Sequence, residues 1–476
     1  MKPLVLTSLA FLLSATSSLA TATPPNDMSI IKDLKRHYAK TEKLNKLNVT
    51  YTKERQTIFQ SDRLDTPFTI HSDYDYKFDF TAGQFYLHQV HHYPGNYIFN
   101  DKIVHQQGKT VLYDVNGFTK GKQLEYLDYD KSDFQEDLYS ELDIFSAHQF
   151  LSSLTPEHST IEQSGNQLKV TVNKPEQEQD KVTYTFTRMP IALTAIVNHS
   201  SNERTEFSNP QNHNGIAVAS TVRHYRNGEL KAKVEITDIK RIMSIKPNVL
   251  AIPKGYGPFV DSTRKPLEWV PLADNLNLIN HVAGNRHVLV KQDMQGLTVF
   301  GIPRSTDTSK QVHNLIKQQL PNQKIHAVYV THGHSDHMGG AAYYGNLGIT
   351  IMADKHSIRA LKAFPRFIKD AKKWNFKTLS HGQTINGVTF YAPKNSHSEG
   401  QSFAYFPQSK IIYQGDFLEI PADNSLPSHM ADVEREFIEF LYQEQIPYQR
   451  IVGHHRNNNM TPTVVNAYYK LHHKRG

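Results

Sequence analysis

Short segments in which hydrophobic and polar residues alternate dominate the chain from about residue 48 to residue 245. The stretches YKFDF (76–80) and QFYLHQV (84–90) are typical of this pattern. Such alternation places one side of a strand against a core and leaves the other side in water. The pair Asn227-Gly228, inside ASTVRHYRNGELKAKVEI, predicts a tight hairpin turn. This region is therefore predicted to be mostly antiparallel β-structure. Helical spacing adds two helices, at 29–47 and 140–154.

The pattern changes at the Pro- and Gly-rich stretch SIKPNVLAIPKGYGPF (244–259). Beyond it, apolar runs such as IHAVYV (325–330) and KIIYQ (410–414) are interleaved with segments of helical spacing. The predicted helices lie at 310–320, 356–374 and 432–445. Strands that alternate with helices are typical of layered α/β structures. We therefore expect two domains, a β-rich one over 23–255 and an α/β one over 265–476.

Residues 1–22 have the layout of a secretory signal peptide. One lysine precedes an apolar run from Pro3 to Leu13, and small residues follow it, with cleavage expected after Ala20 or Ala22. The run is shorter than the roughly 20 residues that a membrane-spanning helix needs. The sequence therefore predicts a periplasmic or secreted protein with a cleaved signal peptide and no transmembrane segment.

Composition and charge narrow the class of protein. The 476 residues are 38% hydrophobic and 21% charged, which is typical of globular proteins. The net charge of +7 comes from scattered Lys and Arg, and the one dense basic run is KLHHKRG at the C-terminus. Scattered basic residues indicate a solvated surface, so no nucleic-acid partner is predicted. Because the chain contains no cysteine, any metal must be held by imidazole and carboxylate groups.

Three histidines and one aspartate stand within six positions of the segment THGHSDHMGG: His332, His334, Asp336 and His337. The cluster follows the apolar run IHAVYV and precedes a pair of glycines, so it lies on a tight loop between a strand and a helix. His332 and His334 are expected to share one face. Asp336 and His337 lie beyond them and are expected to point to a second ion, because one ion cannot take four ligands from six residues without strain. The segment therefore predicts metal binding.

The segment THGHSDHMGG resembles the H-x-H-x-D-H signature of the metallo-β-lactamase superfamily. Later segments match that superfamily in order. His397 in NSHSEGQSFAYFP stands where the next histidine ligand belongs, Asp416 in KIIYQGDFLEIP where many members have a bridging carboxylate, and His454 in RIVGHHRN where the last histidine ligand belongs. The resemblance extends over about residues 267–460. It implies an αββα sandwich, so the predicted fold class is α/β, preceded by a mostly antiparallel β domain.

The same resemblance implies a centre with two metal ions. Its ligands would be His332, His334 and His397 for the first ion, Asp336, His337 and His454 for the second, and Asp416 for both. Of the adjacent residues His454 and His455 only one can point inward, and the Gly-His order of the family favours His454. Three neutral imidazoles leave the first ion an open position, as in catalytic zinc sites. Zinc is the expected metal, with iron and manganese as alternatives.

Such a centre predicts hydrolysis. Two ions that share a water lower its pKa toward about 7, and Asp336 is the candidate that orients this water and takes its proton. The predicted enzyme is an exported dinuclear-metal hydrolase that uses a metal-bound hydroxide to cleave an ester-, lactone-, lactam- or thioester-like bond. The alternative is an iron-dependent oxidoreductase of the same fold, similar to persulfide dioxygenases, which bind one iron. Diiron members of the family place glutamate where this chain has His334, which argues against that branch.

The β-rich region loosely resembles periplasmic lipoprotein carriers, whose half-barrels cradle acyl chains in a concave sheet. The resemblance rests on the order of the elements, a helix followed by many strands, and not on a motif. It implies that this region presents a lipid-like or amphipathic substrate to the metal site, and the alternative is a scaffold or dimerisation domain. A small-molecule or lipid-like substrate is therefore expected, and the sequence carries no signal for the oligomeric state.

Overall fold

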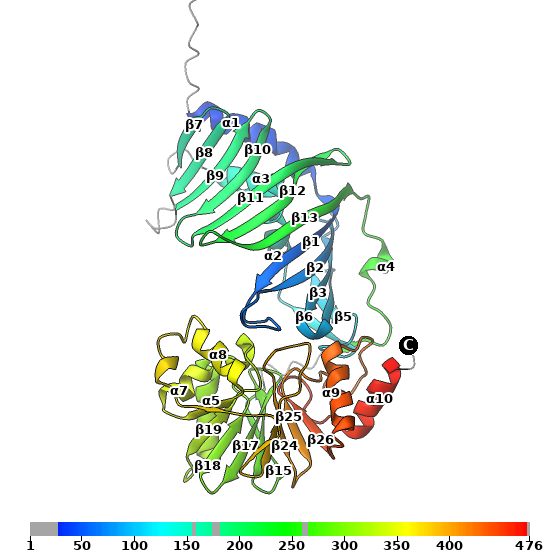
Figure 1. The fold of residues 1–476 in the computed structure, drawn as a ribbon. Helices are drawn as coiled ribbons and strands as arrows, with labels where there is room; N and C mark the ends of the chain where they lie inside the picture. Colours follow the sequence, from blue (N-terminus) through cyan, green and yellow to red (C-terminus); the bar gives the residue numbers. More distant parts are fainter. Residues whose placement is uncertain (1–26, 155–158, 174–180, 259–264, 474–476) are drawn as a thin grey trace, which may run out of the picture.

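The computed structural model describes four stretches of the chain, residues 27–154, 159–173, 181–258 and 265–473. The predicted signal peptide, residues 1–22, lies outside these described residues. Two lobes are visible in Figure 1: a large curved sheet, here the N-terminal lobe, and a layered sandwich, here the C-terminal lobe. Among the helices that are described, none is long and apolar enough to cross a membrane.

The N-terminal lobe is built on one 14-stranded sheet, in the order β14-β6-β5-β4-β3-β2-β1-β13-β12-β11-β10-β9-β8-β7. Its strands are β1 (Lys46–Thr57), β2 (Phe68–Asp79), β3 (Gln84–Tyr93), β4 (Tyr97–Gln106), β5 (Lys109–Asp114), β6 (Gln123–Leu127), β7 (Ser159–Ser164), β8 (Gln167–Asn173), β9 (Lys181–Arg188), β10 (Ile191–Asn198), β11 (Glu203–His213), β12 (Ile216–Arg226), β13 (Glu229–Arg241) and β14 (Gly257–Pro258). Asn227 and Gly228 form the predicted turn between β12 and β13, both with positive φ. The pairing is antiparallel apart from the short β14, which runs parallel to β6. The predicted β-rich, mostly antiparallel region is thus confirmed.

Three helices cover one face of this sheet (Figure 1): α1 (Asp27–Tyr38), α2 (Lys131–Tyr139) and α3 (Asp143–Ser153). Buried aliphatic and aromatic side chains of the helices and the strands form one continuous core. At its centre Phe134 of α2 is fully buried and contacts the rings of Tyr76, Phe78 and Phe85. The protein's own side chains therefore fill the space between sheet and helices. The helix predicted at 140–154 is α3, and α2 before it was not predicted.

The C-terminal lobe contains two sheets that face each other. The first has the order β15-β16-β17-β18-β19-β20-β21 and the second β22-β23-β24-β25-β26. The strands are β15 (Glu268–Ala273), β16 (Leu276–Val282), β17 (Arg286–Asp293), β18 (Gly296–Phe300), β19 (Ile325–Tyr329), β20 (Thr350–Ala353), β21 (Phe376–Thr378), β22 (Gln383–Ile385), β23 (Val388–Tyr391), β24 (Phe403–Phe406), β25 (Ile411–Gln414) and β26 (Arg450–Gly453). The helices are α5 (Thr306–Gln319), α6 (Ser335–Met338), α7 (Ala341–Asn346), α8 (Lys355–Ala363), α9 (Asp432–Gln443) and α10 (Pro462–His473).

Three hydrophobic clusters hold these elements in four layers. Successive residues of a strand point to opposite faces, and the neighbours Val299 and Phe300 of β18 do so. Val299 belongs to the cluster under α5, with Val312, whereas Phe300 belongs to the cluster between the sheets, with Phe390. The third cluster joins the second sheet to α9 and α10 and includes Phe437. The layers are helix, sheet, sheet and helix, which confirms the predicted αββα arrangement.

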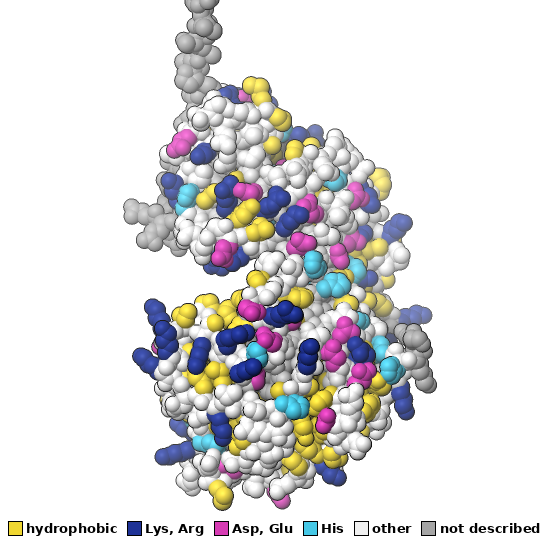
Figure 2. All heavy atoms as spheres, viewed as in Figure 1, with side chains coloured by type: hydrophobic (Ala, Val, Ile, Leu, Met, Phe, Trp, Pro, Cys, Tyr) yellow, Lys and Arg dark blue, Asp and Glu magenta, His cyan; other side chains and the backbone are white. Residues whose placement is uncertain are grey.

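The two lobes meet where turns of the large sheet reach the sandwich. In a run of antiparallel strands alternate turns lie at the same end of the sheet, so the turns at 58–67, 94–96 and 115–122 share one end. Each turn is hydrogen-bonded to the C-terminal lobe: Ser335 N to Phe59 O, His429 Nε2 to Asn96 O and Ser428 N to Asn116 O, each at 2.9 Å. Figure 2 shows that the lobes touch on one side and leave an open notch on the other.

The aromatic core of the N-terminal lobe makes a first prediction. Replacing Phe134 with Ala removes the ring at its centre and leaves a cavity, so we expect a loss of about 3–5 kcal/mol in the free energy of unfolding of this lobe. Chemical denaturation followed by near-UV circular dichroism measures the loss. The control is Tyr126→Ala on β6, whose side chain is 64% exposed and for which we expect a change within about 0.5 kcal/mol. Equal stability of the two variants would contradict this account of the core.

Candidate metal centre

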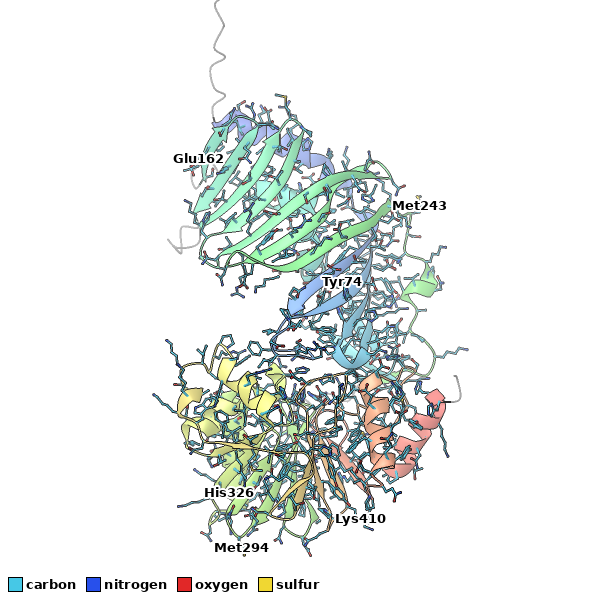
Figure 3. The ribbon with its side chains drawn as sticks, in the orientation of Figure 1. Tyr74, Glu162, Met243, Met294, His326 and Lys410 are labelled. Atoms are coloured by element: carbon cyan, nitrogen blue, oxygen red, sulfur yellow. The ribbon has the colours of Figure 1, made fainter. Side chains whose placement is uncertain are left out.

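The predicted metal-binding loop lies at the end of the sandwich that faces the N-terminal lobe. Figure 3 labels Met294 and His326 near the far end of the sandwich, and β19 runs from there up to the loop that begins at Val330. Glycines let the loop pack closely against its neighbours. A Cβ on Gly333 would lie 2.7 Å from that of Ala360, and one on Gly415 would lie 2.6 Å from Oγ1 of Thr331. Both distances are too short for a side chain, so these positions require glycine.

Four side chains bring their ligand-capable atoms within 4.8 Å of one another: His332, His334, His397 and Asp416. They come from three loops, which follow β19, precede β24 and follow β25. The three imidazoles are at most 4% exposed. Nε2 of His332, Nδ1 of His334 and Nε2 of His397 have no hydrogen-bond partner within the described part of the chain. A cluster of buried nitrogen and oxygen atoms without partners has the donor set that a divalent cation requires.

In each imidazole of this first group, one ring nitrogen makes a hydrogen bond and the other faces the shared centre of the group. These contacts are His332 Nδ1 to Thr331 Oγ1 at 3.2 Å, His334 Nε2 to the Ser61 carbonyl oxygen at 2.9 Å and His397 Nδ1 to the Pro94 carbonyl oxygen at 3.1 Å. A carbonyl oxygen only accepts, so His334 carries its hydrogen on Nε2 and His397 carries its hydrogen on Nδ1. The nitrogens that face the group in these two rings are therefore the unprotonated ones, as metal binding requires.

A second group consists of Asp336, His337 and His455. Nε2 of His337 lies 2.9 Å from Nε2 of His455 and 3.0 Å from Oδ2 of Asp416. The other oxygen of Asp416, Oδ1, lies 3.2 Å from Nε2 of His455. On the side of the first group, Oδ2 of Asp416 lies 3.7 Å from Nε2 of His332. One carboxylate thus contacts both groups, in the position of a bridging ligand.

The structure places the two adjacent histidines differently from the sequence prediction. His455 stands with Asp336 and His337, whereas His454 lies outside both groups. Nδ1 of His454 is 2.7 Å from the hydroxyl of Tyr413, and its Nε2 is buried without a hydrogen bond to any described residue. Consecutive side chains beyond the end of a strand point in different directions, so only one of the pair reaches the second group. We therefore replace His454 by His455 in the candidate ligand set.

Burial and neighbouring charges set the protonation states. Burial lowers the pKa of His332 well below its ordinary value and lowers those of His334 and His455 to about 3. Burial alone would raise the pKa of Asp416, but the side chains of His337 and His455 outweigh it and hold this pKa well below the usual range. Near neutral pH the imidazoles of His332, His334 and His455 are thus neutral and the carboxylate of Asp416 is ionised. These are the forms in which both groups bind metal ions.

Two side chains that the sequence analysis did not single out hold the carboxylate of Asp336. Gln60 Nε2 donates to Oδ1 at 2.9 Å, and Arg286 Nη2 donates to Oδ2 at 3.0 Å. Arg286 is almost fully buried at the start of β17, and Gln60 comes from a turn of the N-terminal lobe. Neither residue belongs to a sequence motif, because each is far from Asp336 along the chain and reaches it only in the folded protein. The Asp336 side chain remains 26% exposed and is therefore accessible to solvent.

Comparison with known proteins identifies relatives of the C-terminal lobe. The sequence model of the metallo-beta-lactamase superfamily matches residues 301–455. A metallo-beta-lactamase type 2 of Pseudomonas aeruginosa is 25% identical over 115 residues, which cover 24% of this chain and 44% of that protein. The chain thus spans less than half the length of this curated relative.

Solved structures match the same part of the chain. The DIM-1 metallo-beta-lactamase is 15% identical, with 44% of this chain and 99% of that chain covered and a TM-score of 0.37. The metallo-beta-lactamase of Hirschia baltica is 18% identical, with 44% and 98% covered and a TM-score of 0.36. The FIM-1 enzyme of Pseudomonas aeruginosa in its mono-zinc form is 14% identical, with 45% and 97% covered and a TM-score of 0.35.

The placement of the last histidine can be tested by counting bound metal. His455→Ala removes a nitrogen from the second group, so we expect it to lose the ion of that group while the first ion stays. His454→Ala removes a side chain that bonds to Tyr413 but belongs to neither group, so we expect it to keep both ions and to lose about 1–3 kcal/mol of stability. Metal analysis of both purified variants, with thermal unfolding, makes the comparison. Loss of metal from His454→Ala but not from His455→Ala would reverse the assignment.

Proposed function

Residues 301–455 belong to the metallo-beta-lactamase superfamily, and from this premise we propose that the protein is an exported hydrolase with two metal ions. The observation that carries the proposal is the position of Asp416. Its two oxygens contact His337 and His455 on one side, and its Oδ2 lies near His332 and His397 on the other. A carboxylate shared by two groups of histidines supports two ions held close together.

The donor set fits divalent metal ions. The first group offers three imidazole nitrogens and the second offers two imidazoles and a carboxylate, with Asp416 between them. Bound divalent ions would act as Lewis acids and would lower the pKa of a bound water toward about 7. Zinc is the metal that we propose, because imidazole and carboxylate ligands suit it and the chain has no cysteine. Iron and manganese remain the alternatives.

Asp336 is the residue that we assign to proton transfer. Its carboxylate stands at the second group and, at 26%, is more exposed than the side chains of the other ligand candidates. Hydrogen bonds from Gln60 and Arg286 fix both of its oxygens and so hold the carboxylate in one orientation at the centre. Burial alone would raise the pKa of Asp336, but the nearby imidazoles outweigh it and hold this pKa well below its usual range, so the carboxylate is ionised near neutral pH.

We propose that the bond cleaved is ester-, lactone-, lactam- or thioester-like. The carbonyl of such a substrate would be polarised at the centre. The carboxylate of Asp336 would take a proton from the attacking water. Two groups of ligand candidates joined by Asp416 favour this reaction over an oxidoreductase with one iron. Because the core of the N-terminal lobe is filled by its own side chains, we favour a small-molecule substrate bound at the loops over an acyl chain held inside the sheet.

A substrate screen tests the proposal. We expect the zinc-loaded protein to hydrolyse at least one member of a panel of lactams, lactones, thioesters, phosphodiesters and sulfate esters, and chelation to abolish the activity. Asp336→Asn is expected to lower kcat by about 100-fold or more, because it removes the proton acceptor. His381→Ala, on an exposed loop, is the control that keeps full activity. Activity that survives chelation, or one iron per chain with oxygen consumption, would contradict the hydrolase.

We also propose export, on the composition of residues 1–22. Mass spectrometry of the protein from a periplasmic extract is expected to give a mature chain that begins after Ala20 or Ala22. An unprocessed chain in that fraction would contradict the proposal.

A further inference from the structure

Both groups of the metal centre are hydrogen-bonded to the N-terminal lobe. The donors and acceptors lie in two neighbouring turns of the large sheet, β1–β2 and β3–β4, which share one end of it. Their partners are His334, Asp336, His397 and the backbone of Asp416. The two lobes of the chain therefore build one site, although about 270 to 320 residues of sequence separate the partners.

The β1–β2 turn is fixed against the His332–His337 loop by its backbone. The Ser61 carbonyl oxygen accepts from Nε2 of His334 at 2.9 Å. On either side of it, Ser335 N donates to Phe59 O at 2.9 Å and Glu399 N donates to Asp62 O at 2.6 Å. The same turn carries Gln60, which donates to Asp336. Several bonds to two different loops of the C-terminal lobe thus set the position of the Ser61 carbonyl.

The β3–β4 turn, with the short 3-10 helix Pro94–Asn96, reaches the other side of the first group. The Pro94 carbonyl oxygen accepts from Nδ1 of His397 at 3.1 Å. Gly95 has φ of +79°, and a Cβ on it would lie 2.9 Å from Val433 and 3.1 Å from Cβ of His397. Next along the chain, the hydroxyl of Tyr97 donates to the backbone oxygen of Asp416 at 3.1 Å. Glycine at position 95 is therefore what allows the turn to approach His397 closely.

We propose that the carbonyls of Ser61 and Pro94 are positioning groups of the metal centre, and that Gly95 and Gln60 are positioning residues for His397 and Asp336. A histidine binds metal through one nitrogen only when the other keeps its hydrogen, and the acceptor of that hydrogen fixes the ring. The two carbonyls impose opposite choices: His334 faces the group with Nδ1, and His397 faces it with Nε2. The N-terminal lobe is thus part of the site and not a separate scaffold. This inference rests on the metal centre of the proposed function.

Zinc affinity gives the first test. Gly95→Ala pushes the β3–β4 turn away from His397, so we expect it to weaken zinc binding by about 10–100-fold, the usual effect of losing such a partner. The matched control is Gly108→Ala. Gly108 also lies in a turn of the sheet with a positive φ of +71°, but a Cβ there meets nothing within 4 Å. It carries the same backbone strain without the contact, so its zinc affinity should match the wild type. Competition with a chelator measures all affinities without any substrate.

A second pair of variants tests the other turn without backbone strain. Gln60→Ala removes the donor to Asp336 and is expected to weaken zinc binding at the second group. Gln56→Ala is its control, because the Gln56 side chain is exposed and, within the described residues, bonds to Thr69 of the same hairpin and to no residue of the metal centre. Thermal unfolding of each metal-free variant separates weaker binding from a failure to fold. Wild-type affinity in both Gly95→Ala and Gln60→Ala would overturn the proposal.

Histidine tautomers provide a readout that a merely structural role would not change. In the metal-free protein labelled with 15N-histidine, NMR is expected to find His334 protonated on Nε2 and His397 protonated on Nδ1. In Gly95→Ala the signal of His397 should change and that of His334 should not. Finding the same tautomer for both rings in the wild type would overturn the inference. The zinc affinities and the tautomers test this inference even if no substrate is hydrolysed. Failure of the inference can therefore be distinguished from failure of the proposed hydrolase function.

Discussion

Buried nitrogen atoms without hydrogen bonds are the constraint on which this structure depends. Nε2 of His332, Nδ1 of His334 and Nε2 of His397 converge beside Asp416, and all three atoms are buried. Each such group costs about 1–3 kcal/mol when it is left unpaired. A protein tolerates several such groups at one site only when the rest of the fold is well packed and a ligand offsets the lost free energy. A metal ion does so, because it accepts lone pairs from all of these atoms at once.

The sandwich explains how residues so far apart in sequence meet. The ligand candidates follow or precede strands of both sheets, so the loops that carry them emerge at the end that faces the N-terminal lobe. The backbone is strained where the groups join, since Asp416 has φ of +60°, an unusual value for a residue with a side chain. Such strain costs of the order of 1–3 kcal/mol and is typical of functional sites. Gly415 before it leaves room for His337, because a Cβ there would lie 3.0 Å from that ring.

The sequence predicted what depends on local pattern. Near neighbours along the chain determine the strand patterns of both lobes and the spacing of His332, His334, Asp336 and His337. The order of the later ligands follows from a family signature. The family's Gly-His order favoured His454, whereas the structure groups His455 with Asp336 and His337, since that choice depends on which way the chain leaves β26. It also gave no sign of Gln60 or Arg286, whose partners lie in distant segments. The half-barrel analogy likewise did not foresee α2 and its Phe134, which help fill the sheet's face.

A site shared by two lobes couples metal binding to the contact between them. The Ser61 and Pro94 carbonyls are backbone atoms, so their positions depend on the turns of a 14-stranded sheet and not on side-chain rotamers. Anything that separates the turns from the sandwich releases the rings of His334 and His397 together. By linkage, metal binding must then strengthen the docking of the lobes by the same free energy with which docking strengthens metal binding. The large sheet thus contributes to the chemistry by holding two imidazole rings in place, although none of its side chains is among the ligand candidates.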